Sequence, residues 1–265
     1  MDQPRNPMRT GSVSLDLALG RGWRRGCIID IQGKTGSGKT TLAEHAVHAL
    51  ESDDAALWIP LGTEVPTRCQ NVVLARPESA EEAFTVINAA LCEGAALIVV
   101  DTANGLVRQR EIDGDPSYVP DTHREYKFEL AIVKTLCTEY GGSVMFLSMP
   151  RANQHPPIRG TGISEKAQQR VSLKIQSEHQ DGTKRVTARV AGTDKYADFD
   201  IKPGTGIDWA TDLLHTAVEA EVINFRGSWY YLNHTRVQGF DRAAHYLRQN
   251  PQYASDLYEY LTGNV

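Results

Sequence analysis

Cysteine is scarce in this chain, and its spacing forms neither a metal motif nor a disulfide framework. The four cysteines among the 265 residues, Cys27, Cys69, Cys92 and Cys137, are scattered and include no Cys-x-x-Cys pair. This distribution argues against a zinc ribbon and against a small secreted domain held by disulfides. We therefore expect a reducing compartment and predict a cytoplasmic protein.

Long apolar runs are missing as well. The longest strongly apolar run covers residues 95–100, whereas a membrane helix needs about 20 such residues. The first seven residues lack the apolar core of a signal peptide. The sequence therefore predicts no membrane segment and no membrane partner.

Positive charge is not in excess. The chain has 28 Lys and Arg against 33 Asp and Glu, which gives a net charge of −5. That balance excludes a histone-like coat of positive charge, although it allows a local basic groove. Between residues 151 and 189, eight basic residues stand against three acidic ones. This pattern is typical of a groove that neutralises nucleic-acid phosphates, but a solvated loop with scattered arginines is the alternative that composition alone favours.

Short apolar strands alternate with helical segments over the first 150 residues. The predicted strands cover residues 27–31, 56–59, 71–74, 97–100 and 144–147, and the predicted helices cover residues 41–50, 79–93 and 124–140. Because parallel strands are joined by crossover helices, this order predicts a mainly parallel sheet with helices on both faces.

The residue composition and the predicted secondary structure change after residue 150. A loop rich in proline, glycine and arginine precedes two hairpin-like runs, 170–177 and 185–190, and a more helical section from about residue 207. We therefore predict an α/β protein with a core of residues 1–206 and a small α+β C-terminal domain of residues 207–265.

A phosphate-binding motif stands between the first predicted strand and the first predicted helix. It reads Gly33-Lys34-Thr35-Gly36-Ser37-Gly38-Lys39-Thr40 and fits the pattern G-x-x-x-x-G-K-[ST]. Backbone N–H groups of such a loop and the N-terminus of the following helix attract phosphates. Lys39 is predicted to reach the β- and γ-phosphates of ATP and Thr40 to hold Mg²⁺, and Thr41 completes the nucleotide-binding set.

Two carboxylates complete the predicted ATP site. The apolar strand of residues 97–100 ends in Asp101, which places this carboxylate at the carboxyl edge of the sheet, where it is expected to help hold the metal. Hydrolysis also needs a residue that orients water. Glu64 follows the second predicted strand and is the catalytic candidate, with a solvated loop glutamate as the alternative.

Several further segments together resemble the RecA recombinase family. They are the lead-in of residues 10–20, the strand end Asp101-Thr102-Ala103-Asn104-Gly105-Leu106, the runs 111–115 and 146–151, and the C-terminal runs 227–230 and 243–251. Their order along nearly the whole chain is more specific than the phosphate motif alone. The resemblance implies a RecA-like P-loop ATPase core and a DNA-dependent ATPase that uses ATP and Mg²⁺. It further implies a recombinase that binds single-stranded DNA and promotes homologous pairing and strand exchange.

The resemblance also implies where DNA binds. Two loops, of about residues 108–122 and 151–164, are expected to face single-stranded DNA and homologous duplex DNA. The expected contacts come from Arg108, Arg110, Arg151, Arg159, Gly160, Gly162 and Lys166. The chain is expected to associate with copies of itself in a filament or a ring, and to lie at the nucleoid, or in the host cytoplasm where a phage encodes it.

Departures from the family pattern favour a divergent, phage-encoded member. Only nine residues precede Thr10, so we expect this chain to lack the family's N-terminal oligomerisation helix. The family's glutamine that senses the γ-phosphate aligns with Met149, whose thioether is a poor hydrogen-bonding group. Ser148 is expected to substitute partly for that glutamine. Ser148 and Met149 are both assigned to coupling between ATP binding and DNA binding. The shortened region near Glu64 leaves the catalytic carboxylate displaced from its usual position.

One basic residue is assigned to the ATP of a neighbouring copy. Arg189 lies on the run that in the resembling family presents basic residues to the adjacent subunit, where a cation stabilises transition-state charge. The alternative is an ion pair across the hairpin with Glu178 or Asp181.

Two rival functions stay open beside the recombinase. One is a ring-forming, helicase-like P-loop ATPase, and the other is a regulatory ATPase of the KaiC type that does not bind DNA. Stimulation of ATP hydrolysis by single-stranded DNA separates the second rival from the other two functions.

Overall fold

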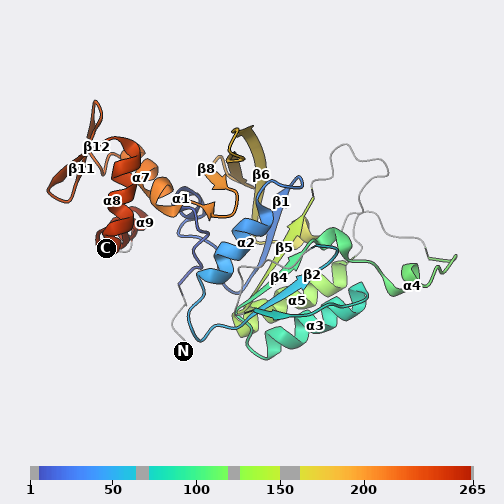
Figure 1. The fold of residues 1–265 in the computed structure, drawn as a ribbon. Coiled ribbons are helices and arrows are strands. Elements are labelled where there is room, and N and C mark those ends of the chain that lie inside the picture. The colour runs from blue at the N-terminus through green and yellow to red at the C-terminus, as the bar shows by residue number, and fades with distance from the viewer. Residues whose placement is uncertain (1–5, 64–71, 119–125, 150–161, 264–265) are drawn as a thin grey trace.

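A large sheet runs through the centre of the protein (Figure 1). The computed structural model describes residues 6–63, 72–118, 126–149 and 162–263, and within them this sheet has nine strands in the order β3-β2-β4-β5-β1-β6-β7-β8-β9. The strands are β1 (Ile28–Gly33), β2 (Ala56–Pro60), β3 (Val72–Leu74), β4 (Leu97–Asp101), β5 (Ser143–Ser148), β6 (Gln169–Glu178), β7 (Lys184–Val190), β8 (Tyr196–Lys202) and β9 (Gly206–Ile207). The first six in this order are parallel and the last three continue the sheet antiparallel. The predicted α/β class with a mainly parallel sheet is confirmed.

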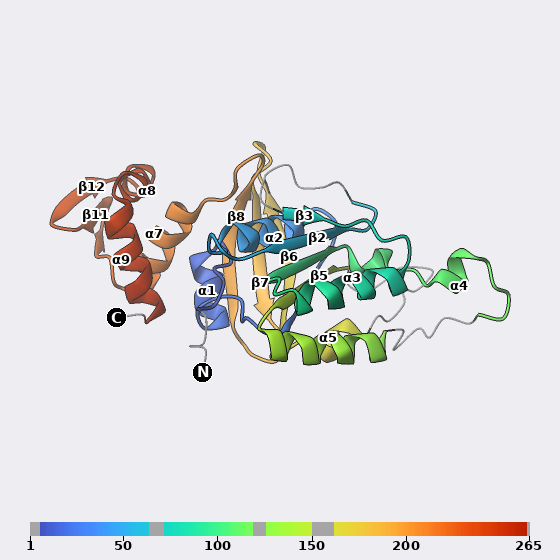
Figure 2. The same cartoon turned by 90° about the horizontal axis from the view of Figure 1, so that it is seen from below.

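Helices cover both faces of the sheet (Figure 2). The core helices are α1 (Val13–Leu19), α2 (Lys39–His48), α3 (Ala80–Cys92), α4 (Gln109–Ile112), α5 (Lys127–Tyr140) and α6 (Ile163–Lys166), with a 3₁₀ turn, η1, at Ala103–Gly105. In both views α4 projects from the core on the side away from the C-terminal helices. None of the helices in the described ranges has the length and apolar character needed to cross a bilayer.

Alternation along the strands builds two cores, one on each face. In β4, Val99 packs in the cluster that contains Leu42 of α2, whereas Val100 packs in the cluster that contains Phe84 of α3. Successive side chains of a strand point to opposite faces, so a continuous apolar run is what a strand buried on both faces requires. This explains why the short run of residues 97–100 could be recognised as a central strand.

Strand β8 and helix α1 are among the core elements that were not predicted from the sequence. Strand β8 has the alternation of a half-buried strand, with Ala197 and Phe199 buried and Asp198 between them less so, a pattern of period two that sequence analysis can detect. Helix α1 carries an N-cap at Ser12, whose side chain accepts a hydrogen bond from the Leu15 N–H, which is a recognised start signal. Both elements are short, and each rests on neighbours distant in sequence.

The C-terminal part of the chain is a small unit of helices and a three-stranded antiparallel sheet. It comprises α7 (Trp209–Glu219), β10 (Phe225–Arg226), β11 (Trp229–Leu232), β12 (Thr235–Gln238), α8 (Phe240–Gln249) and α9 (Pro251–Thr262). Its apolar cluster also includes Val13 of α1. The predicted start of this unit at residue 207 falls inside β9, which still belongs to the large sheet.

A buried carboxylate on α1 joins the N-terminal segment to the last helix. Asp16 accepts a hydrogen bond from the Thr10 N–H at 2.8 Å and another from the Tyr258 hydroxyl at 3.0 Å, and it is 1% exposed. Burial, only partly offset by these hydrogen bonds, raises the pKa of Asp16 to about 6. A carboxylate with a raised pKa makes the folded state less stable once it ionises.

We predict that Asp16 makes stability depend on pH in the mildly acidic range. The folded state binds this proton more tightly than the unfolded chain, whose aspartate pKa lies near 3.8. The free energy of unfolding should therefore fall by up to about 3 kcal/mol as the pH rises from about 4 to about 6. Urea unfolding at a series of pH values measures this change. In Asp16→Asn protein, the free energy of unfolding should fall less over this pH range. In Asp113→Asn protein, at an exposed position, it should fall as in the unmodified chain. Equal pH slopes for all three proteins would contradict the assignment.

Candidate nucleotide and DNA site

The phosphate motif forms the loop between β1 and α2. Two of its glycines are favoured for different reasons: a Cβ on Gly33 would stand 2.3 Å from the Ser37 Oγ, whereas Gly38 has a φ of +94°, a backbone conformation that other residues rarely adopt. The side chain of Ile201 on β8 lies against Gly38. Helix α2 starts at Lys39, two residues earlier than predicted.

Lys39 turns back onto the loop that precedes it. Its ammonium donates hydrogen bonds to the carbonyls of Gly33 at 2.8 Å and Lys34 at 3.1 Å, and the residue is 6% exposed. Burial lowers the pKa of Lys39, while the charge of Asp101 opposes that shift. The structure thus holds a cation at the phosphate loop in an environment where an anion is strongly attracted.

The predicted metal-binding pair is brought together by the sheet. The Thr40 hydroxyl donates to the Asp101 Oδ2 at 2.9 Å, across α2 and the end of β4. Burial raises the pKa of Asp101, and the Thr40 hydrogen bond and the charge of Lys39 lower it. The sequence could predict this meeting because the carboxyl ends of parallel strands share one edge of the sheet.

Two buried oxygens at this edge have no hydrogen-bond partner among the described residues. They are the Asp101 Oδ1 and the Ser37 Oγ. Buried polar atoms are normally paired, and a carboxylate beside a threonine hydroxyl is the oxygen donor set that Mg²⁺ uses when phosphates supply its other ligands. The residues present therefore fit a magnesium–nucleotide complex.

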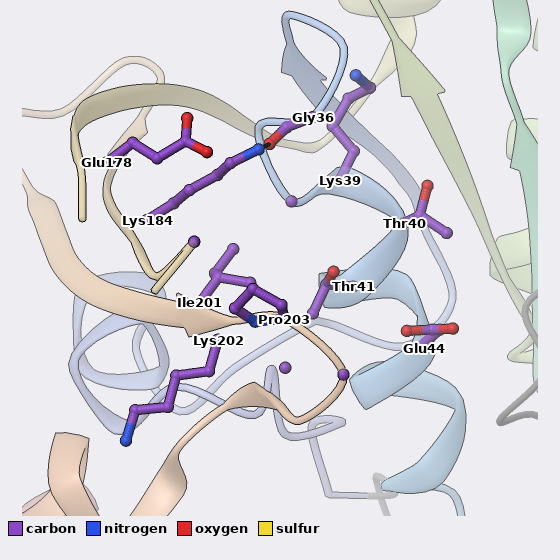
Figure 3. Close-up of a pocket in the computed structure, with 14 residues that line it drawn as sticks. Gly36, Lys39, Thr40, Thr41, Glu44, Glu178, Lys184, Ile201, Lys202 and Pro203 are labelled. Carbon is purple, nitrogen blue, oxygen red and sulfur yellow. Dashed lines mark hydrogen bonds between the residues drawn. The ribbon is translucent and has the colours of Figure 1, made fainter. Parts of the chain in front are cut away.

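An open pocket of about 610 Å³ adjoins the phosphate loop (Figure 3). One wall is the loop and the start of α2, and the other is formed by the end of β6, the turn between β6 and β7, β7, β8 and the turn after β8. The lining residues are Gly36, Gly38, Lys39, Thr40, Thr41, Glu44, Glu178, Gly182, Lys184, Ile201, Lys202, Pro203, Gly204 and Gly206. Lys184 reaches across it, and its ammonium donates to the Gly36 carbonyl at 3.3 Å.

Sequence reasoning missed the second wall of this pocket. Lys184, Ile201 and Pro203 lie more than 140 residues beyond the phosphate motif, and no local pattern links them to it. Recognition of β8 as a strand was the missing step, since antiparallel pairing of β8 with β7 carries Ile201 to the position opposite Lys184.

The segment after β2 is tied to Asp101 through its backbone. The Asp101 carbonyl accepts hydrogen bonds from the Leu61 N–H at 2.6 Å and the Thr63 hydroxyl at 2.7 Å. Thr63 immediately precedes Glu64, the predicted catalytic carboxylate, which lies outside the described residues. The role of Glu64 stays a prediction.

The comparison with known proteins decides the family. A model described as the RecA N-terminal domain matches residues 2–127, and one described as the RecA C-terminal domain matches residues 211–264. Protein RecA of Thermosynechococcus vestitus is 30% identical over 94% of this chain and 78% of its own length. The chain belongs to the RecA family. Protein RecA of Clostridium novyi is 31% identical over 91% of this chain and 78% of its own, and Protein RecA 2 of Myxococcus xanthus is 29% identical over 94% and 78%. The resemblance read from the sequence is thereby confirmed.

Arg108, a predicted DNA contact of this RecA-family chain, is engaged within the protein. Its Nη1 lies 2.6 Å from a carboxylate oxygen of Glu129 and 3.4 Å from one of Glu81. The guanidinium also lies over the ring of Tyr126, 4.7 Å from its centroid. Its side chain is 18% exposed. These contacts fasten the segment after β4 to α3 and α5, and the role of Arg108 toward DNA stays a prediction.

Arg110, its neighbour on α4, is 60% exposed and pairs with Asp115 at 2.7 Å. The hydroxyl of Ser117 and the Arg110 guanidinium lower the pKa of Asp115 to about 2. An exposed ion pair contributes little to stability, so Arg110 can exchange this partner for a phosphate at small cost.

The second predicted DNA loop lies partly outside the described residues. Arg151, Arg159 and Gly160 fall there, and their assignment stays a prediction. Gly162 adopts the left-handed conformation, with φ +76°, and leads into α6, which carries the partly buried Lys166.

The two coupling residues are held by different contacts. The Ser148 hydroxyl donates to the Asp30 Oδ1 at 2.5 Å. The backbone N–H of Met149 donates to the Asn104 Oδ1 at 2.9 Å, so the amide of Asn104 ties this position to the turn after Asp101. The side chain of Met149 takes no part in that contact. Sequence reasoning named Ser148 and Met149 but neither of their partners.

Arg189 is exposed on β7, opposite Ser172 on one side and Tyr196 on the other. Glu178 instead stands opposite Lys184, so the alternative of a cross-strand pair between Arg189 and Glu178 or Asp181 is wrong. The pairing of β6 with β7 sets this register, and residue types alone did not fix it. Arg189 lies five positions along β7 from Lys184, roughly 17 Å from the pocket end of the strand, and its role toward a neighbouring copy stays a prediction.

Proposed function

We propose that this member of the RecA family is an ATP-dependent recombinase that binds single-stranded DNA and promotes homologous pairing and strand exchange. The observation that carries the proposal is the pairing of Thr40 with Asp101 beside the phosphate loop in a chain that aligns with RecA proteins over most of its length. Single-stranded DNA, homologous duplex DNA and further copies of the chain are the proposed partners.

Each residue of the site has a proposed part in ATP hydrolysis. Lys39 stabilises negative charge that grows on the transferred phosphoryl group, and Glu64 orients the attacking water. Thr40 and Asp101 would hold Mg²⁺, which when bound neutralises charge on the phosphates. Since Lys39 and Asp101 are nearly inaccessible to water, their charges act on the phosphates with little screening.

The rival functions are separated by two measurements. Single-stranded DNA should stimulate ATP hydrolysis, whereas a regulatory ATPase of the KaiC type should not respond to it. Electron microscopy of the protein on DNA with ATP should then show a helical filament. Closed rings would favour the helicase-like motor, and an ATPase indifferent to DNA would overturn the proposal.

We predict that Lys39→Ala abolishes ATP hydrolysis and leaves the protein folded. The lysine ammonium interacts with loop carbonyls at a pocket wall, so its loss removes a cation for the phosphates without opening either apolar core. Steady-state phosphate release and thermal unfolding measure the two effects. Lys134→Ala, at an exposed position on α5, is the matched control. Normal turnover by folded Lys39→Ala protein would refute the assigned site.

Binding of single-stranded DNA should weaken with salt through the second loop. Replacement of Arg151 and Arg159 together by alanine should lower the slope of log affinity against log salt by about 1.4, the contribution of two phosphate contacts on a single strand. Fluorescence anisotropy of a labelled oligonucleotide at several salt concentrations measures the slope. A pair of exposed lysines elsewhere, Lys134 and Lys195, serves as the charge-matched control. An unchanged slope in the arginine variant would place the DNA elsewhere.

Mixing of two inactive variants tests whether Arg189 acts on a neighbour's ATP. Arg189→Ala protein should be inactive alone and should regain activity when mixed with Lys39→Ala protein, because some interfaces then pair an intact phosphate loop with an intact arginine. Such a cation in trans can contribute several powers of ten in rate. ATP turnover across a range of mixing ratios is the measurement. If mixed assemblies form and turnover does not recover, Arg189 does not act in trans.

A further inference from the structure

A carboxylate in the middle of β1 is buried, and no described residue pairs it with an opposite charge. Asp30 is 0% exposed and forms no ion pair with any described residue. It accepts three hydrogen bonds from neutral side chains instead: from the Ser148 hydroxyl at 2.5 Å, the Ser164 hydroxyl at 2.7 Å and the Gln32 amide at 2.8 Å. Gln32 also donates to the Ser164 Oγ at 2.6 Å, so the four side chains form one closed cluster.

The members of this cluster come from three segments with different predicted tasks. Asp30 lies three residues before Gly33, where the phosphate loop begins. Ser148 ends β5, one residue before Met149. Ser164 lies on α6, just beyond the second predicted DNA loop. Both flanks of the sequence between residues 149 and 162 are therefore bonded to a single carboxylate, and that carboxylate belongs to the strand that carries the phosphate loop.

The chemistry of the cluster makes it stiff. Buried hydrogen bonds in a connected network strengthen one another, and a buried polar group that loses a partner bears a desolvation cost. Parallel pairing of β1 with β5 places Gln32 beside Ser148, which fixes two of the donors on adjacent strands. A displacement of β1 at the phosphate loop is therefore resisted by both serines, and it is passed to both of the segments on which they lie.

We infer that Asp30 is a positioning residue that couples the nucleotide site to the DNA-binding segment, through Ser148 on one flank and Ser164 on the other. The inference rests on the proposed function, since it assigns the residues that link ATP binding to DNA binding. It also explains how the chain couples ATP to DNA with Met149 at the position of the family's polar sensor. The side chain of Met149 takes no part in this link.

The chain contains a matched control for this cluster. Asp212 is a second buried aspartate held by serines: its carboxylate accepts from the Ser12 hydroxyl at 3.0 Å and from the Ser14 hydroxyl at 3.0 Å. It joins α1 to α7, away from the phosphate loop. Loss of the Ser14 hydroxyl therefore imitates the chemical loss at Ser164 and leaves the proposed link intact.

The test compares affinities for a labelled oligothymidylate with and without a non-hydrolysable ATP analogue and Mg²⁺. The ratio of the two affinities measures coupling. The unmodified chain should show a ratio well above one. Ser164→Ala and the double variant Ser148→Ala/Ser164→Ala should lower it, the double variant by about tenfold, with affinity for the analogue alone unchanged within about twofold. Ser164→Thr, which keeps the hydroxyl, should restore the ratio, and Ser14→Ala should not change it.

The outcomes separate the two proposals. If the unmodified chain binds DNA equally with and without the analogue, the proposed ATP-dependent function fails and the inference falls with it. If the unmodified chain shows coupling and the serine variants keep its full ratio, the inference is overturned and the proposed function stands. An equal loss in Ser14→Ala protein also overturns it, because the effect would then be one of general stability. Asp30→Ala extends the test where that variant folds.

Discussion

The central place of β1 in the parallel sheet is the constraint on which the rest of the structure depends. The strand has β5 on one side and β6 on the other, and its side chains alternate between the two apolar cores, with Ile29 in one and Ile28 in the other. Because β1 is parallel to both of its neighbours, the loop that follows it leaves at the carboxyl edge of the sheet, where the neighbouring parallel strands also end. The phosphate loop, Asp101 and the end of β5 meet there as a consequence of strand order.

Much of this edge could be predicted from the sequence, since each part has a local signal. The phosphate motif has its spacing, and the run that ends in Asp101 has the continuous apolar character of a strand buried on both faces. Their contact then follows from parallel pairing alone. The Glu64 position lacks such a signal, because no strand or helix pattern fixes where a side chain lies in the turn that follows β2.

What could not be predicted is what comes from pairing between segments distant in sequence. Ile201 reaches the phosphate loop only because β8 pairs with β7, and Ser164 reaches Asp30 across 134 residues. The ion pairs of Arg108 with carboxylates of α3 and α5 also join distant segments, and its predicted contact with DNA stays a prediction. The composition of a segment gives the number of its charged residues, but only the tertiary contacts show which of them form ion pairs.

Helix α1 contributes to two cores at once, which limits the ways in which this protein can exchange parts with its relatives. Leu15 packs under the large sheet and Val13 packs with α7 to α9, while Tyr258 near the end of the chain bonds to Asp16. A recombination breakpoint between residues 207 and 209 would separate the α1 surface from the α7 to α9 surface, and Asp16 from its hydrogen-bond partner Tyr258. Successful chimaeras within the family should therefore inherit the first 20 residues and the C-terminal unit from the same parent.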